Sequence, residues 1–155
     1  MTRLTRFAAA ATLALLACGD DDDPAGPNAP LNGSLTAVVD GQQWTATTIA
    51  ADYLGQIGAL VIAGSDAAGL GIAFSVPTDD VGTFTVQTTP GMNATVTAGG
   101  VGWLAVAGTG SGTVTISTLT SSRAVGTFSF VLVADDAGTN PQARTVTSGQ
   151  FDVTY

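Results

Sequence analysis

The feature that most constrains this chain is an alternation of apolar and polar residues that begins near Leu35 and continues to the last residue. In residues 127–132, for example, two phenylalanines and a leucine alternate with threonine, serine and valine. A period of two places every second side chain on one face of a β-strand. Threonine suits the solvated face, because its branched Cβ is stiff and its hydroxyl stays hydrated. The pattern therefore predicts an all-β domain.

Glycine-rich turns divide this pattern into about ten strands, which suggests an antiparallel β-sandwich or a flattened meander barrel. The expected strands are residues 35–39, 43–49, 57–64, 70–76, 81–88, 92–98, 101–107, 112–119, 124–134 and 144–154. Residues Ile49–Leu54 could instead hold one helical turn between strands. The apolar alternation reaches Tyr155, so we expect the last strand to be paired inside the sheet.

The N-terminus has a different pattern, with two arginines followed by the apolar run Phe7–Ala17 and a cysteine at position 18. A membrane-spanning helix needs about 20 apolar residues, and this run is too short. The order of these features resembles a bacterial lipoprotein signal peptide that ends in the lipobox Leu15–Cys18. The resemblance implies that residues 1–17 are removed and that Cys18 receives lipid. An ordinary secretory signal peptide is the alternative.

Residues 18–34 follow as an acidic segment rich in proline and glycine, which we expect to be a disordered tether. About sixteen flexible residues would span roughly 20–25 Å. The four aspartates after Cys18 resemble the tags that direct some lipoproteins to the outer face of the outer membrane, although they also suit a solvated spacer. We therefore expect an outer-membrane protein, with the leaflet left open, and a single β domain over residues 35–155.

The composition excludes several functional classes. The sequence has twelve aspartates and four arginines, with no lysine, glutamate or histidine. After removal of residues 1–17, two arginines would remain, and the formal charge would be 2 − 12 = −10. Nucleic-acid binding needs cations that neutralise phosphate, so we expect no nucleic-acid partner. The usual histidine bases, Schiff-base lysines and histidine metal ligands are missing, and the single cysteine is the expected lipidation site, so we expect a non-enzymatic protein without a cofactor.

Five short motifs occur along the domain in a fixed order. They are Val39–Trp44 (Val-Asp-Gly-Gln-Gln-Trp), 82–85 (Gly-Thr-Phe-Thr), 112–116 (Gly-Thr-Val-Thr-Ile), 126–130 (Gly-Thr-Phe-Ser-Phe) and 149–153 (Gly-Gln-Phe-Asp-Val). This order resembles a family of small uncharacterised lipoproteins of Bacteroidota and related phyla. The resemblance implies an envelope lipoprotein with an all-β domain, and it implies no catalytic residues.

Three aromatic residues are candidates for ligand binding, namely Trp44, Trp103 and Tyr53. Exposed rings on a β-sandwich can stack on sugars or anchor a partner. A glycan-binding function therefore requires that at least one indole is accessible to solvent. Packing of each tryptophan in or near the core is the alternative.

The remaining candidates are acidic. Asp135, Asp136 and Asn140 form an oxygen-rich segment that could bind Ca²⁺, although an acidic hairpin tip explains it equally well. The two acidic pairs, Asp79–Asp80 and Asp135–Asp136, could serve a carboxylate-dependent hydrolase, but such pairs are also common in turns. The leading hypothesis is an interaction or structural module that reaches the membrane through Cys18. An envelope protein or a glycan is the expected partner, and the oligomeric state is left open.

Overall fold

The computed structural model describes residues 32–135 and 142–155, which contain eleven β-strands. The strands are β1 (Gly33–Val39), β2 (Gln42–Thr45), β3 (Thr48–Leu54), β4 (Ala59–Ser65), β5 (Gly71–Pro77), β6 (Gly82–Thr85), β7 (Asn93–Ala98), β8 (Val101–Ala105), β9 (Ser111–Leu119), β10 (Arg123–Ala134) and β11 (Arg144–Thr154). All paired strands are antiparallel, which confirms the predicted all-β class. These residues include no helix that could cross a membrane.

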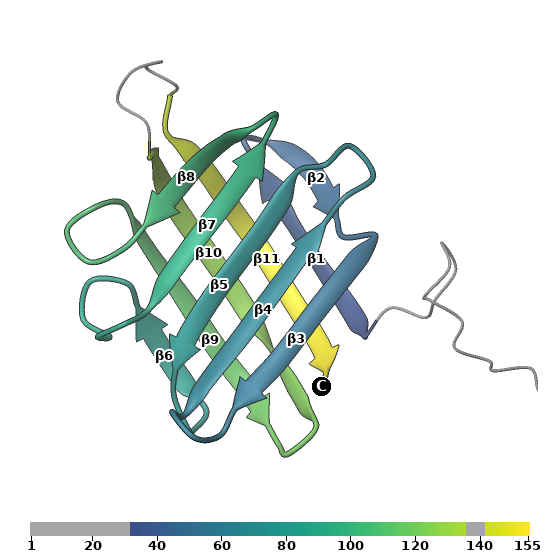
Figure 1. The fold of residues 1–155 in the computed structure, drawn as a ribbon, viewed down its shortest axis with the longest axis vertical. Coiled ribbons are helices and arrows are strands. Elements are labelled where there is room, and N and C mark those ends of the chain that lie inside the picture. Colours follow the sequence, from purple (N-terminus) through teal and green to yellow (C-terminus); the bar gives the residue numbers. More distant parts are fainter. Residues whose placement is uncertain (1–31, 136–141) are drawn as a thin grey trace, which may run out of the picture.

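The strands form one strongly curled sheet that folds over into two layers, as Figure 1 shows. The front layer has the strand order β3-β4-β5-β7-β8, and the rear layer has the order β2-β1-β11-β10-β9-β6. Strand β10 belongs to both layers. Its residues up to Val131 pair with β9, whereas Val133 and Ala134 pair with β8. The sheet is therefore continuous along this side, and β3 forms the free edge of the front layer.

The chain crosses from the rear layer to the front layer at Ala46 and Thr47. The Ala46 amide donates a hydrogen bond to a β1 carbonyl (3.0 Å), and the Thr47 amide donates one to a β4 carbonyl (2.8 Å). The expected strand 43–49 is therefore two strands, β2 and β3. The helical turn considered for Ile49–Leu54 is wrong, because these residues pair with β4. No glycine, proline, asparagine or aspartate marks the crossing, so the sequence gives no turn signal there.

Three glycines of the rear layer lie directly opposite phenylalanines on neighbouring strands. The pairs are Gly112–Phe130, Gly126–Phe151 and Gly149–Phe128. A Cβ atom added to any of these glycines would lie within 2.6 Å of an atom of the opposite ring. Each ring therefore occupies the space above its glycine, an arrangement that covers exposed backbone in a sheet. This pairing gives a physical reason for the glycine at the start of three of the sequence motifs.

The same three rings join the two layers. Phe74 of β5 comes from the front layer and is buried, with 2% of its surface exposed. Its ring centroid lies 5.0 Å from that of Phe128, 5.7 Å from that of Phe130 and 5.8 Å from that of Phe151. These separations are in the range of favourable aromatic contacts. The centre of the core is thus one front-layer ring surrounded by three rear-layer rings.

Strand β11 lies in the middle of the rear layer, as expected for the C-terminal strand. It pairs with β1 on one side and with β10 on the other. The register shifts between Val146 and Gly149, and Ser148 between them has a positive φ of 50°. Such a β-bulge inserts one residue and reverses the direction of the following side chains. Val146 and Gly149 are consequently both buried, which a regular strand would not allow.

Candidate functional site

The outer face of the rear layer carries polar side chains in rows that run across the strands. The long row is Thr83, Thr115, Thr127, Gln150, Thr36 and Thr45, in the order β6 to β2, and each residue lies opposite the next. A shorter parallel row is Thr85, Thr113 and Ser129. We refer to these nine residues as the hydroxyl rows. They face outward because the apolar residues between them fill the core.

The hydroxyl rows form an accessible surface. All nine side chains are exposed or half-buried. Two shallow grooves of about 390 Å³ and 480 Å³ run over this face, and their linings include Thr113 and Ser129. Hydroxyl groups both donate and accept hydrogen bonds, and a glutamine amide adds two donors and an acceptor. The face is therefore suited to ligands rich in hydroxyl or amide groups, such as glycans and extended peptides.

A polar cluster lies at the β1–β2 turn, at the far end of β1 from Gly33. Asp40 and Gly41 have φ values of 49° and 83°, which are typical of a two-residue primed hairpin turn. The Asp40 carboxylate accepts hydrogen bonds from the Thr145 amide at 2.8 Å and from the Arg144 guanidinium at 2.9 Å. That guanidinium also lies 4.3 Å from the centroid of the Trp103 ring. This cation–π contact contributes about 0.5–1 kcal/mol and joins β11 to β8. The hydrogen bonds to Asp40 join β11 to the β1–β2 turn.

Both candidate tryptophans lie in the interior. Trp44 is 3% exposed and Trp103 is 6% exposed. The indole N–H of Trp44 donates to the Leu70 carbonyl at 3.2 Å, and that of Trp103 donates to the Gln142 carbonyl at 2.9 Å. Both tryptophans therefore pack in the core, as the second interpretation of the sequence had it, and neither ring is presented for stacking on a sugar. Each indole instead combines a buried ring with a satisfied polar group.

Tyr53 lies at the opposite end of the domain from the β1–β2 turn. Its hydroxyl donates a hydrogen bond of 2.6 Å to the Asp79 carboxylate. This bond, together with partial desolvation, raises the pKa of Tyr53 above its ordinary value. The Tyr53 ring centroid is 6.2 Å from that of Tyr155. The structure thus places Tyr53 near the C-terminus, far from Trp103, and does not gather the three aromatic candidates into one site.

The acidic candidates are only partly covered by the structure. Asp135 is exposed at the end of β10, whereas Asp136 and Asn140 lie outside the described residues, as does Cys18. Over residues 32–135 and 142–155, no three cysteine, histidine or acidic side chains come together as a metal site would require. Asp79, a candidate for hydrolysis, is engaged with the Tyr53 hydroxyl, as described above.

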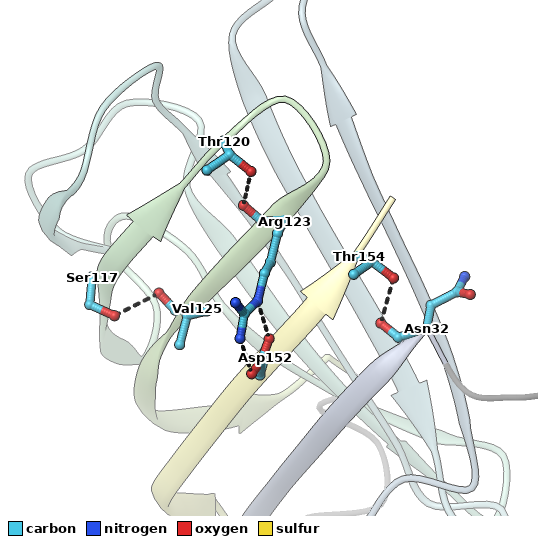
Figure 2. Close-up of polar contacts among 7 residues, drawn as sticks. All are labelled: Asn32, Ser117, Thr120, Arg123, Val125, Asp152 and Thr154. Carbon is cyan, nitrogen blue, oxygen red and sulfur yellow. Dashed lines mark hydrogen bonds and ion pairs between the residues drawn. The ribbon is translucent and has the colours of Figure 1, made fainter.

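The other described arginine forms an ion pair of its own. Figure 2 shows Arg123 of β10 against Asp152 of β11, with two hydrogen bonds of 2.8 and 2.7 Å. These bonds hold the pKa of Asp152 below its ordinary value of 3.8. Both described arginines are thus paired with an aspartate, Arg123 with Asp152 and Arg144 with Asp40.

The comparison with known protein families gives one result. A family model described as "Domain of unknown function (DUF6252)" matches residues 32–153. The chain belongs to the DUF6252 family. No curated protein and no solved structure matches it. The matched span runs from the residue before β1 to the last residues of β11, so the DUF6252 domain and the described fold coincide.

In this DUF6252 domain, the sequence motifs serve the fold. Val39–Trp44 contains the β1–β2 turn and a buried indole. The motifs that begin at Gly112, Gly126 and Gly149 contain the glycines that accommodate phenylalanine rings. The hydroxyl rows were not singled out from the sequence as a site. Their signal was the Thr-x-Thr spacing in neighbouring strands, which becomes a row only once the register is known.

Proposed function

We propose that this chain is a lipid-anchored protein of the bacterial cell envelope and that its DUF6252 domain is a non-enzymatic interaction module. The lipobox at Leu15–Cys18 supports the anchor, and the acidic segment after it supports a tether at the outer membrane. The lack of lysine, histidine and glutamate supports a binding or structural function over catalysis.

One structural observation favours the interaction function above all. The hydroxyl rows present nine polar side chains, in register, on the outer face of the rear layer. The described chain begins beside β1 at one end of the domain, and the two grooves lie over the outer face of the rear layer (Figure 1). A broad polar face of this kind fits a weak or multivalent contact with an envelope protein.

The anchor is tested by mass spectrometry of the mature N-terminal peptide. The wild-type chain should carry an acylated Cys18 and sediment with membranes, whereas the variant Cys18→Ser should lose both properties. Gln42→Ser, an exposed change within the domain, serves as the control and should remain acylated. A wild-type protein with a free thiol at Cys18 would contradict the proposal, and turnover of an envelope substrate would contradict its non-enzymatic part.

Glycan binding is a second candidate, now based on the hydroxyl rows instead of the indoles. Calorimetric titration with peptidoglycan and lipopolysaccharide oligosaccharides tests it. Thr127→Val in the long row should weaken binding, because it removes an exposed hydroxyl and keeps the shape of the side chain. Thr95→Val, on the outer face of the front layer, is the matched control. Absence of heat with every glycan, or equal effects of both variants, would leave the protein-partner hypothesis.

A further inference from the structure

Three large apolar side chains are exposed at one end of the domain. Leu54 is 40% exposed, Ile57 is 72% exposed and Val81 is 55% exposed. Leu54 ends β3, Ile57 lies in the turn to β4, and Val81 lies in the connection from β5 to β6. We refer to these three residues as the apolar tip. Isolated exposed apolar residues need no explanation, but a group of them in adjacent loops indicates a contact surface.

The two loops that carry the apolar tip are fastened together. The Thr78 amide donates a hydrogen bond of 2.7 Å to the carbonyl of Gly58, which connects the β5–β6 loop to the β3–β4 turn. The bond between the Tyr53 hydroxyl and Asp79 makes a second connection between the same segments. The two loops that carry the apolar tip therefore hold each other in place.

The apolar tip lies at the end of the domain where the chain enters. Strands β3, β5 and β11 all end there, and β1 begins there (Figure 1). The Thr154 amide donates to the Asn32 carbonyl at 2.8 Å, so the start of β1 is fastened beside the end of β11. The Tyr155 ring, one residue further, contacts the Tyr53 ring. A continuous series of contacts thus connects the start of β1 with the two loops that carry the apolar tip.

The sequence limits how far this end can lie from a lipid anchor. Fourteen residue steps separate Cys18 from Asn32, which even at full extension span about 50 Å. A lipidated Cys18 would therefore keep Asn32, and the end of the domain beside it, near the bilayer. Such tethering turns a weak surface contact into an intramolecular one with a high effective concentration.

We propose that the apolar tip rests on the bilayer surface when Cys18 is lipidated, and this proposal rests on the lipid anchor proposed above. Three apolar side chains are too few to hold a protein on a membrane alone, but an acylated tether removes that requirement. Tyr53 and Tyr155 behind the tip are of the type enriched at the membrane interface. Asp79 and Asp80 in the same loop oppose an anionic surface, so the contact favours zwitterionic headgroups.

The test uses the full acylated chain in vesicles of phosphatidylethanolamine and phosphatidylcholine. A single cysteine at the tip, Ile57→Cys, is labelled with an environment-sensitive fluorophore. The matched control is Ala68→Cys, an exposed position in the β4–β5 turn at the opposite end of β4. We expect a blue shift and quenching by nitroxide-labelled lipid at position 57 and neither change at position 68. Added phosphatidylglycerol should reduce the quenching.

Each other outcome has a distinct meaning. Membrane-bound protein with no quenching at position 57, or with equal quenching at positions 57 and 68, overturns the proposal and leaves the anchor intact. Disulfide formation between two membrane-bound copies of the unlabelled Ile57→Cys variant, and not of Ala68→Cys, overturns it in favour of self-association. Acylation consumes the Cys18 thiol, so wild-type protein that takes up the fluorophore instead shows that the proposed anchor itself has failed.

Discussion

The front and rear layers have similar inner faces but different outer faces. Inside, both layers contribute phenylalanine and branched aliphatic residues to one core. Outside, the rear layer carries the hydroxyl rows and the Arg123–Asp152 ion pair. The front layer instead exposes a shallow groove of about 360 Å³, whose lining mixes small apolar residues such as Ala50, Ala63 and Ala73 with the hydroxyls of Thr95 and Thr97. Alternation alone therefore specifies the core, and the choice of outward residues distinguishes a face with long polar rows from a face that mixes small apolar and polar side chains.

The largest effect should come from shortening the rear layer. Removal of residues 150–155 deletes the end of β11 and with it pairings to both β1 and β10. It also removes Phe151 from the aromatic contacts that join the layers. We expect loss of the cooperative thermal transition, measured by circular dichroism. A truncated chain that melts at the wild-type temperature would show that the C-terminal register is wrong.

The next effect tests the contact between the layers. Phe74→Ala removes the front-layer ring that meets three rear-layer rings, and it should reduce the free energy of unfolding by about 3–5 kcal/mol. Phe84→Ala is the control, because Phe84 lies on β6 and is only half-buried. Urea denaturation should show a clearly smaller loss for the control. Equal losses would mean that Phe74 has no special part in joining the layers.

A smaller effect separates two glycines, one in each layer. Gly126→Ala would place a Cβ atom about 2.1 Å from a backbone carbonyl oxygen and 2.5 Å from the Phe151 ring. We expect a loss of about 1–3 kcal/mol from overpacking. Gly102→Ala, on β8 of the front layer, meets nothing within 4 Å and should be neutral or slightly stabilising. Denaturant melts of both variants check this, and a neutral Gly126→Ala would contradict the proposed packing of the ring.

The smallest effect concerns acid stability and belongs to the rear layer. Because Arg123 lowers the pKa of Asp152, the ionised carboxylate stabilises the fold above the ordinary pKa of 3.8. This stabilisation is lost as the pH falls through the lower pKa of the folded state. Arg123→Gln should therefore flatten the dependence of stability on pH below about 4. An unchanged pH profile in acid denaturation would show that the pair has no energetic part in the fold.

Much of the fold could be predicted from the sequence because apolar alternation and glycine turns are strong local signals. The antiparallel class and the central position of the last strand were predicted on this basis and are confirmed. The crossing at Ala46–Thr47 was missed, because the threonines and alanine around it are typical of a continuous strand. The Ile49–Leu54 segment was ambiguous, because alanines at positions 50 and 51 reduce the contrast between its two faces.

The candidate site was less predictable, because it depends on register and burial. The alternation of Trp103 with Ala105 favoured a packed ring, which the structure confirms, but Trp44 follows a turn, where the sequence left packing and binding open. The bulge at Ser148 changes which residues of β11 face outward; the Ser148–Gly149 pair that marks it was taken as part of a continuous strand. The hydroxyl rows arise only when six strands align. Cys18 remains a sequence-based prediction, since it lies outside the described residues.

The position of β1 has a mechanical consequence. It pairs with β11 along nearly its whole length and with β2 over its last four residues, Thr36–Val39. A pull on the chain ahead of Gly33, directed along β1, loads these hydrogen bonds in shear, so that many must break together. Resistance to such a pull depends on the rate of unfolding under load and not on equilibrium stability. The β1–β11 pairing is thus the part of the fold that such a pull would load first.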